Sequence, residues 1–517
     1  MKSLNSIGQK FADELTHVNS AIEHQLRAAE DADKIHVTGV GATITKAYEQ
    51  LRNASENSDE ILLLQRAIRR FYKRLLLTPE KFSTSGTELI SELTMAGYLE
   101  NDSIAKTTAD KISQFAGQFL ELRKALPKTI NGDKLNRYTI DTLSVKIESL
   151  LHNHGRELAL SNLAYNYFIK AIDPEKLFDH KPISYEAMLL AATQKTILRY
   201  DDATVRHNLI ARYGISIADA PAYQLFNQQL DHMFANHDSD VLLHFVDRRS
   251  AVFRVLNRQI DDNGLPKSLT KQDSFLNIFT TATSKSYHAI SRSVNKGVWR
   301  SILFLIITKF IIGFAIEAPY DVLTVGAIVW GPLIINLLFP PVYMFILRLT
   351  LIMPGQTNSR ELSREVDRIL YSDAIDTIYI NPKNTSAGFG KVYQIVYGLV
   401  VLAVACGVGY YLWTIGFMWV QLLIFFVFVS AASFLGFRLS RWIREIETID
   451  GHQSLITTVR DLLYMPFVAI GRWVNEKYAR INIVSRALDV IVELPLKTLL
   501  GWIRQWNNFL SAKKDEL

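Results

Sequence analysis

Hydrophobic residues recur at helical spacing through most of the first 300 residues. Near the start, an apolar residue appears every three or four positions, at Leu4, Ile7, Phe11, Leu15, Val18, Ile22 and Leu26. Because an α-helix has ~3.6 residues per turn, this spacing places one apolar stripe on a long amphipathic helix. Similar patterns predict helices over residues 41–53, 58–77, 85–97, 101–125, 136–152, 157–170, 182–198, 201–236 with a break near Pro221, 240–260 and 270–295. Residues 35–40 are the one strand candidate, and one strand makes no sheet.

The second half of the chain contains apolar runs long enough to cross a membrane. Residues 392–437 carry no charged side chain. As a helix they would extend about 69 Å, roughly twice the ~30 Å hydrocarbon core of a bilayer. We therefore predict a hairpin of two spans, 392–413 and 417–437, with its turn at 414–416. Two earlier apolar runs, 301–316 and 322–347, predict another pair of spans.

The first pair of predicted spans is less regular. The polar segment 317–321 interrupts the apolar pattern, and the second span contains Pro332, Pro340 and Pro341. Proline lacks a backbone donor and clashes with the preceding turn, so this span is expected to be kinked or broken. A re-entrant or interfacial arrangement of one segment is the alternative.

These patterns predict an all-α protein in five parts. We expect a large helical domain over residues 1–296, a first transmembrane hairpin over 297–347, a loop over 348–391, a second hairpin over 392–437 and a tail over 438–517. The tail holds two apolar stretches, 462–474 and 488–510, that are too short or too interrupted to span. They predict amphipathic helices in the plane of the membrane, with packing on the front domain as the alternative.

Basic residues flank the predicted spans on one side of the membrane, so basic and non-basic connections alternate along the chain. They are Arg292, Lys296 and Arg300 before the first span, Arg348, Arg360, Arg364, Arg368, Lys383 and Lys391 between the hairpins, and Arg438, Arg441 and Arg444 after the last span. Since positively charged loops stay in the cytoplasm, both termini and the middle loop are expected there. The first 31 residues lack the apolar core of a signal peptide, which with the scarcity of cysteine favours a bacterial inner membrane.

Composition excludes several classes of function. The net charge of +6 is small for 517 residues, so nucleic acid is not an expected partner. The single cysteine, Cys406, excludes disulfides within one chain and cysteine-ligated zinc or iron–sulfur sites. Gly39 and Gly41 lack the third glycine of a dinucleotide-binding turn, and the histidines and aspartates of residues 232–244 contain one pair at helical ligand spacing. We therefore expect no catalytic, metal or cofactor site.

Three ionisable residues lie inside the first hairpin. Lys309, Glu317 and Asp321 are candidate intramembrane or transport residues, because a charge within the bilayer is costly. The carboxylates lie about 12 and 18 Å from the lysine along a straight helix, at ~1.5 Å per residue. Pairing therefore requires another helix, a second subunit or a break near Pro319. The alternative is a lysine that extends towards the interface.

Two further sets of residues predict binding or packing surfaces. One helix face carries Arg66, Arg69, Arg70, Lys73 and Arg74. This basic face is a candidate for anionic lipid headgroups, with a solvated, ion-paired face or nucleic acid as alternatives. Small residues recur four apart at Ala403 and Gly407, Ala405 and Gly409, and Ala432 and Gly436. They predict helix packing within one chain or between copies in a homo-oligomer.

The hypothesis that combines these features is a multi-pass protein of the lipid bilayer that anchors a helical cytoplasmic domain. It would act as a non-enzymatic scaffold that binds a protein partner or a membrane surface. The alternative is a channel or transporter that uses Lys309 and the proline-containing second span.

Overall fold

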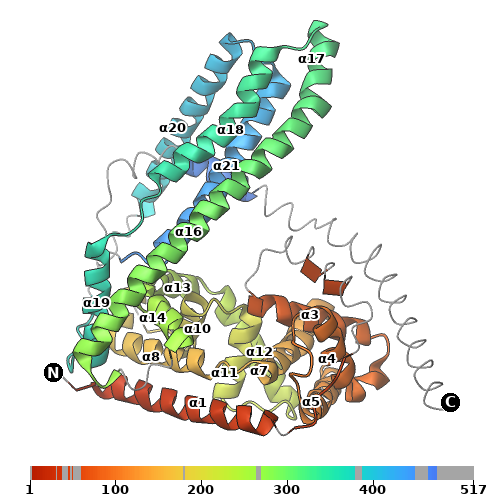
Figure 1. Cartoon of the computed structure of the whole chain (residues 1–517), viewed down its shortest axis with the longest axis vertical. Coiled ribbons are helices and arrows are strands. Elements are labelled where there is room, and N and C mark those ends of the chain that lie inside the picture. Colours follow the sequence, from red (N-terminus) through yellow and green to blue (C-terminus); the bar gives the residue numbers. More distant parts are fainter. Residues whose placement is uncertain are drawn as a thin grey trace.

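The computed structural model describes residues 3–30, 32–37, 45–46, 49–50, 60–178, 181–263, 269–378, 387–448 and 464–473. Within these ranges the chain is all-α, as predicted, and the only strand-like feature is an isolated bridge between Lys34 and Ala105. Figure 1 shows a globular helical domain and an elongated helical bundle that rises from one side of it.

The front domain is built from helices of one to seven turns. Its longer helices are α1 (Ser6–Glu30), α3 (Glu60–Leu75), α4 (Gly86–Met95), α5 (Lys106–Ala125), α7 (Thr142–Leu151), α8 (Gly155–Ala171), α10 (Tyr185–Ile197), α11 (Asp202–Arg212), α12 (Ala220–Ala235), α13 (His237–Arg249) and α14 (Ala251–Asn263). Shorter ones are η1 (Pro79–Thr84), α6 (Gly132–Asn136), η2 (Arg137–Asp141) and α9 (Pro174–Phe178). The predicted segments 201–236 and 240–260 each form two helices, because Pro221 begins a new first turn and Ser250 separates α13 from α14.

The apolar stripe of α1 faces the domain, as its spacing predicts. Ile7, Phe11 and Leu15 are buried, and the helix packs on α8 and on α19 (Gln356–Tyr371). Asn5 caps the start of α1 through its side-chain oxygen, and its amide donates to the backbone carbonyls of Ile369 (2.9 Å) and Ser372 (2.7 Å). The first helix is thereby tied to the loop between the two transmembrane hairpins.

A partly buried histidine joins two carboxylates of the front domain. Both ring nitrogens of His154 lie 2.7 Å from a carboxylate oxygen, Nε2 from Glu148 and Nδ1 from Glu157. Burial alone would lower the pKa of His154, but the hydrogen bonds and charges of the two glutamates raise it to about 10. The ring is therefore an imidazolium at neutral pH, and both of its N–H groups donate.

This arrangement makes the stability of the domain depend on His154. We expect His154→Leu to lower the free energy of unfolding by about 3 kcal/mol, because the change leaves the buried Glu148 and the partly buried Glu157 without their cation. The stabilisation from His154 is complete below its ordinary pKa of 6.5 and is lost as the pH rises through about 10. Thermal unfolding of the detergent-solubilised chain between pH 6 and 10 measures both effects.

The matched control is His36→Leu, since the His36 side chain is 69% exposed beside Asp102. This control should leave the unfolding temperature almost unchanged. Equal effects of the two substitutions, or a His154→Leu penalty that grows with pH, would contradict the assignment.

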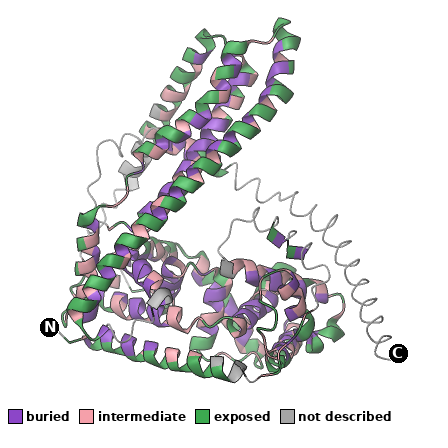
Figure 2. Ribbon diagram, viewed as in Figure 1, coloured by how far each residue is buried: buried purple, intermediate pink, exposed green. Residues whose placement is uncertain are grey.

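Four helices of the described chain are long and apolar enough to cross a membrane, in agreement with the four predicted spans. They are the continuous segment of α16 (Gln272–Ile312), η3 (Gly313–Glu317) and α17 (Ala318–Val325), then α18 (Trp330–Thr350), α20 (Ala387–Thr414) and α21 (Trp419–Arg444). Figure 2 shows exposed residues along the outer sides of this bundle, and many are apolar side chains such as Phe304, Leu338 and Leu399. Apolar residues in such positions are typical of a lipid-facing surface, so the chain is a membrane protein.

Two details of the hairpins differ from the sequence pattern. The polar segment 317–321 does not interrupt the first span, because the chain passes through it as a π-helical turn followed by α17. The second span, predicted to be kinked or broken, remains one unbroken helix through Pro340 and Pro341, both of which are buried. The turn between α20 and α21 lies at Ile415 and Gly416, within the predicted range 414–416. Gly416 has a φ of 101°, a backbone conformation that favours glycine.

One helix belongs to both parts of the molecule. The 41 residues of α16 pack first against α14 and α19 and then against α18 and α21, so the expected domain boundary at residue 296 falls inside a continuous helix. At Gly297 the backbones approach closely, because a Cβ there would lie 2.6 Å from a methyl group of Leu439. Figure 1 shows α16 rising without interruption from the domain into the bundle.

Hydrogen bonds also join α19 and α14 to the residues just beyond the last span. Asn358 of α19 donates to the carbonyl of Ile446 (2.8 Å) and accepts from the backbone N–H of Thr448 (2.8 Å), just beyond α21. Arg254 of α14 donates to the carbonyl of Glu445 (3.1 Å). These contacts hold the loop between the hairpins and the end of the last span against the domain.

Part of the predicted C-terminal tail packs on the bundle. Residues 464–473 form a helix in which Tyr464 and Val468 are buried against Leu347 of α18. A Cβ on Gly471 would lie 2.5 Å from the carbonyl oxygen of Ser430 in α21. This helix therefore contacts the spans rather than the front domain. The predicted helix at 488–510 lies outside the described residues.

Candidate functional site

The intramembrane residues predicted from the sequence come together in the structure. Lys309 and Glu317 form a direct ion pair, with 2.5 Å between Nζ and Oε1, and their side chains are 1% and 0% exposed. Both lie in the half of the bundle that is remote from the front domain, where α16 continues into η3. The lysine therefore does not extend towards the interface but is held inside the bundle.

A π-helical turn makes this pairing possible along a single helix. The N–H of Ala318 bonds the carbonyl of Gly313, five residues earlier, instead of the α-helical partner four residues earlier. Pro319 has no N–H with which to continue the α-helical pattern, so a local irregularity is favoured next to it. The sequence left three ways for Lys309 to pair with a carboxylate: another helix, a second subunit or a break near Pro319. In the structure the pair forms within one chain, through the irregular helical turn beside Pro319.

Amide side chains extend the ion pair into a network across the bundle. The Nδ2 group of Asn336 in α18 donates to Glu317 Oε2 (3.0 Å) and to the carbonyl of Gln421 (3.1 Å). Gln421 in α21 donates through Nε2 to Asp321 Oδ1 (2.8 Å), and the N–H of Val329 donates to the other oxygen (3.2 Å). We refer to Lys309, Glu317, Asp321, Asn336 and Gln421 as the polar network. It links three of the four spans.

The surroundings of the polar network are apolar. The Lys309 ammonium lies 4.8 Å from the centre of the Phe428 ring, a cation–π contact that adds to its pairing with Glu317. A cavity of about 140 Å³ is lined by Lys309 and Glu317 and otherwise by Phe310, Gly313, Phe314, Trp330, Leu333, Ile334 and Leu337. The charges of the pair are bound to each other and the rest of the lining is apolar, so the cavity offers few ligands to replace the hydration shell of an ion, which favours a structural ion pair.

Sequence reasoning did not identify Asn336 and Gln421 as members of this network. The available signal was their isolation, since each is the single amide side chain within its predicted span, 322–347 for Asn336 and 417–437 for Gln421. Polar residues at such positions hydrogen-bond across helices, because lipid cannot satisfy them.

The predicted basic face in the front domain has carboxylate partners within the chain. Arg69 lies 2.9 Å from Asp201, Arg70 lies 2.7 Å from Glu49, and Arg74 lies 2.6 Å from Glu92. Asp201 and Glu92 come from other helices or helix caps of the front domain, so the face is ion-paired within the chain. Lipid binding by Arg66, Arg69, Arg70, Lys73 and Arg74 stays a prediction, and the three ion pairs favour the structural alternative.

The small residues of the second hairpin lie in different environments. In α21, Ala432 is buried and a Cβ on Gly436 would lie 2.9 Å from Leu347, so this pair faces α18 in the same chain. In α20, Gly409 lies near Phe426. Ala403 and Gly407 are exposed on the outer side of α20.

The remaining sequence motifs do not form a site in the described chain. Gly39 and Gly41 lie outside the described residues, and within those residues no group of three or more His, Cys, Asp or Glu side chains is arranged to hold a metal ion. No family model, curated protein or solved structure matches the chain. Functional inference therefore depends on the geometry of the molecule itself.

Removal of one member of the central ion pair should destabilise the bundle. We expect Lys309→Met to lower the free energy of unfolding by about 3–5 kcal/mol, because Glu317 would remain buried without a cation. The double variant Lys309→Met with Glu317→Gln should recover most of this loss. Thermal unfolding of the purified chain in detergent provides the measurement.

Lys285→Met serves as the matched control, because Lys285 lies on the same helix and is exposed. It should have little effect on unfolding. A Lys309→Met variant as stable as the wild-type chain, or a double variant no more stable than the single one, would show that the pair does not stabilise the bundle.

Proposed function

We propose that this chain is a non-enzymatic, membrane-anchored scaffold. Its four spans hold the helical front domain in a fixed position at the cytoplasmic surface of a membrane, the bacterial inner membrane in our interpretation. Both termini and the loop between the hairpins lie on the same side as the domain. The partner is a protein or a membrane surface that contacts this domain.

The observation that carries the proposal is the continuity of α16. A single helix of 41 residues packs against the domain with one end and against the other spans with the other. A flexible tether would be sufficient to keep a domain near a membrane, whereas a continuous helix also fixes its orientation. The bonds of Asn358 and Arg254 to residues just beyond α21 add further points of fixation.

A channel or transporter is the second candidate, and the buried polar network favours it. Lys309, Glu317 and Asp321 all lie inside the bundle, where ionisable residues often mark a transport route. Two features argue for the scaffold instead. The lysine is directly paired with Glu317, and apart from this pair the cavity is lined by apolar residues.

Flux measurements separate the two candidates. We expect proteoliposomes that contain the wild-type chain to show no more flux of protons, Na⁺, K⁺ or Cl⁻ than empty liposomes, and Lys309→Met to change nothing. Wild-type flux that Lys309→Met abolishes would replace the scaffold by a transport function. The unfolding temperature of each reconstituted protein shows that the comparison concerns folded chains.

The orientation can be tested by cysteine labelling in a Cys406→Ser background. Leu323 is 86% exposed in α17, at the end of the bundle that is remote from the domain, and Lys111 is an exposed residue of α5. We expect a membrane-impermeant maleimide to label Leu323→Cys in intact spheroplasts and to label Lys111→Cys only after lysis. The reverse pattern would place the domain outside the cell and contradict the proposed topology.

A further inference from the structure

An open groove of about 830 Å³ lies along α16, in the part of this helix that precedes the first predicted span. One wall is formed by α16 between Asn277 and Ser293, and α14 contributes Arg258 and Gln259 to the other. At ~1.5 Å per residue the α16 wall extends about 24 Å. The groove is therefore long enough to receive about four turns of another helix, at ~5.4 Å per turn. We refer to it as the α16 groove.

Small side chains line the α16 wall at the spacing of a helix-packing seam. They are Ala282, Ser286, Ala289 and Ser293, which follow one another at intervals of four, three and four residues. This spacing places all four on one side of the helix, and Ala289 and Ser293 are exposed there. Small residues let a second helix approach closely, since the distance between packed helices depends on the side chains at the contact. The shape of the groove thus favours a helical occupant.

The α16 groove is basic. Arg258 lies on one wall and Lys285 on the other, and none of the described residues that line the groove is acidic. Neither cation forms a hydrogen bond or ion pair with a residue that the structure describes. The sequence of α16 contains no acidic residue from 274 to 312, and the exposed Arg292 lies two turns beyond Lys285 on the same side. The groove therefore complements a negatively charged occupant.

The surroundings of Arg258 leave its charge only partly compensated. Burial lowers the pKa of Arg258, the Glu445 charge raises it, and the charges of Arg199 and Arg254 lower it again. Glu445 is itself paired with Arg199. A carboxylate from outside the chain would therefore stabilise the Arg258 guanidinium.

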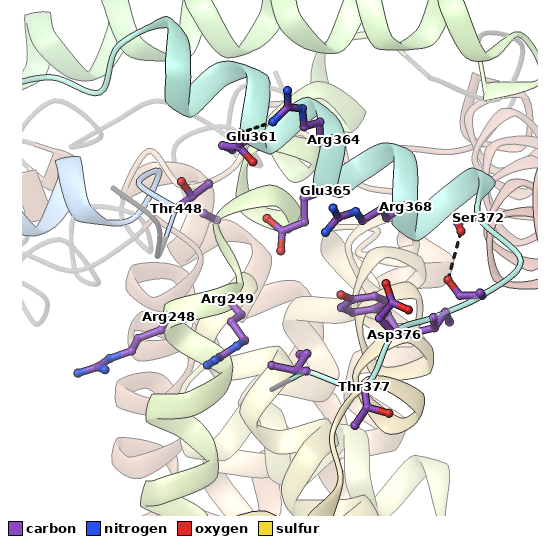
Figure 3. A pocket seen from close by; sticks show the side chains of 15 residues that line it. Arg248, Arg249, Glu361, Arg364, Glu365, Arg368, Ser372, Asp376, Thr377 and Thr448 are labelled. Carbon is purple, nitrogen blue, oxygen red and sulfur yellow. Dashed lines mark hydrogen bonds and ion pairs between the residues drawn. The ribbon is translucent and has the colours of Figure 1, made fainter. Parts of the chain in front are cut away.

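The cavity between α13 and α19, of about 390 Å³, has a mixed lining instead. Arg248 of α13 and Arg368 of α19 line it together with Glu365, and Arg364 in the same lining is paired with Glu361 (2.7 Å). Figure 3 shows the glutamates among the arginine side chains. With four arginines and three carboxylates among its described lining residues, this cavity is nearly neutral, so it does not favour an acidic partner as the α16 groove does.

Lipid headgroups do not reach most of the α16 groove. Ser293 precedes Ser301, where the first predicted span begins, by eight residues, and Asn277 precedes it by 24. Along the continuous helix these positions lie about 12 and 36 Å from the start of the span, at ~1.5 Å per residue (Figure 1). The headgroup layer on each side of a bilayer is only about 5–8 Å thick. The occupant of the groove is therefore not a lipid.

We propose that the α16 groove binds an acidic amphipathic α-helix of a partner protein. Carboxylates of the partner lie opposite Arg258 and Lys285, and an apolar stripe of the partner packs against the small residues of α16. This is the helix-in-groove mode of recognition, with the charges setting the choice of partner. The inference rests on the scaffold function proposed above, and it names where the partner binds and the chemistry that the partner carries.

The test is site-specific photocrosslinking of the full-length chain in cells that naturally produce it. Ala289, which is exposed in the α16 groove, is replaced by the photoreactive residue benzoylphenylalanine. We expect irradiation to give an adduct with a second protein. Mass spectrometry should place the cross-link in a segment of that protein that has a net negative charge and apolar residues at helical spacing.

Charge variants show whether the groove selects this adduct. Lys285→Glu should lower the yield of the adduct about fivefold or more, because like charges across an interface oppose association. The matched control, Lys111→Glu, reverses an exposed cation of α5 and should leave the yield unchanged. Thermal unfolding of each purified variant in detergent shows that the comparison concerns folded chains.

A second photoreactive position separates this proposal from the scaffold function. Leu225 is 58% exposed on α12, away from the groove lining. A protein adduct at Leu225 but not at Ala289 would overturn the groove and leave the scaffold, and no protein adduct at either position would contradict both. The groove proposal also fails if the adduct at Ala289 is a second copy of the chain, a lipid or a segment without net negative charge, or if Lys285→Glu leaves the yield unchanged.

Discussion

Backbone hydrogen bonds run without interruption through α16, from its contacts with the front domain to its contacts with the other spans. This continuity constrains the rest of the molecule. The domain cannot turn relative to the bundle unless α16 bends, and a bend requires the loss of hydrogen bonds within the helix. The second and fourth spans are attached to the same domain surface through α19 and through Asn358 and Arg254. The domain and the bundle are therefore parts of one rigid framework.

The polar network performs the corresponding role inside the bundle. Lipid cannot satisfy a buried amide or carboxylate, so each member must find its partner on another helix or on a deformed part of its own. Asn336 and Gln421 can make their bonds only if α18 and α21 keep one register relative to η3 and α17. Such a network specifies one arrangement of apolar helices that could otherwise slide against each other.

The sequence was sufficient to predict the features that depend on local pattern. Uncharged runs predicted the spans, and Gly416 lies in the turn that was expected between residues 414 and 416. Features that depend on three-dimensional proximity were not accessible in this way. Glu317 lies too far from Lys309 along an ideal helix, and only the π-helical turn brings them together.

The same limit applies to the front domain. Glu148 and Glu157 were not identified as partners of His154, although all three lie close together in sequence, because their meeting depends on the chain direction between α7 and α8. Arg248 and Arg368 are far apart in sequence, so their common cavity exists only because α19 folds back onto the front domain. Local periodicity predicts where helices form, and the contacts between helices decide which side chains meet.

The central claim is that the front domain and the transmembrane bundle form one rigid unit. Spin labels at Asp240 on α13 and at Leu349 near the end of α18, in a Cys406→Ser background, allow the distance between the two parts to be measured by pulsed electron resonance in liposomes. The account predicts a single distance distribution as narrow as that of a control pair within the domain, Asp240 and Lys111. A broad or multimodal distribution for the Asp240–Leu349 pair, beside a narrow control, would contradict it.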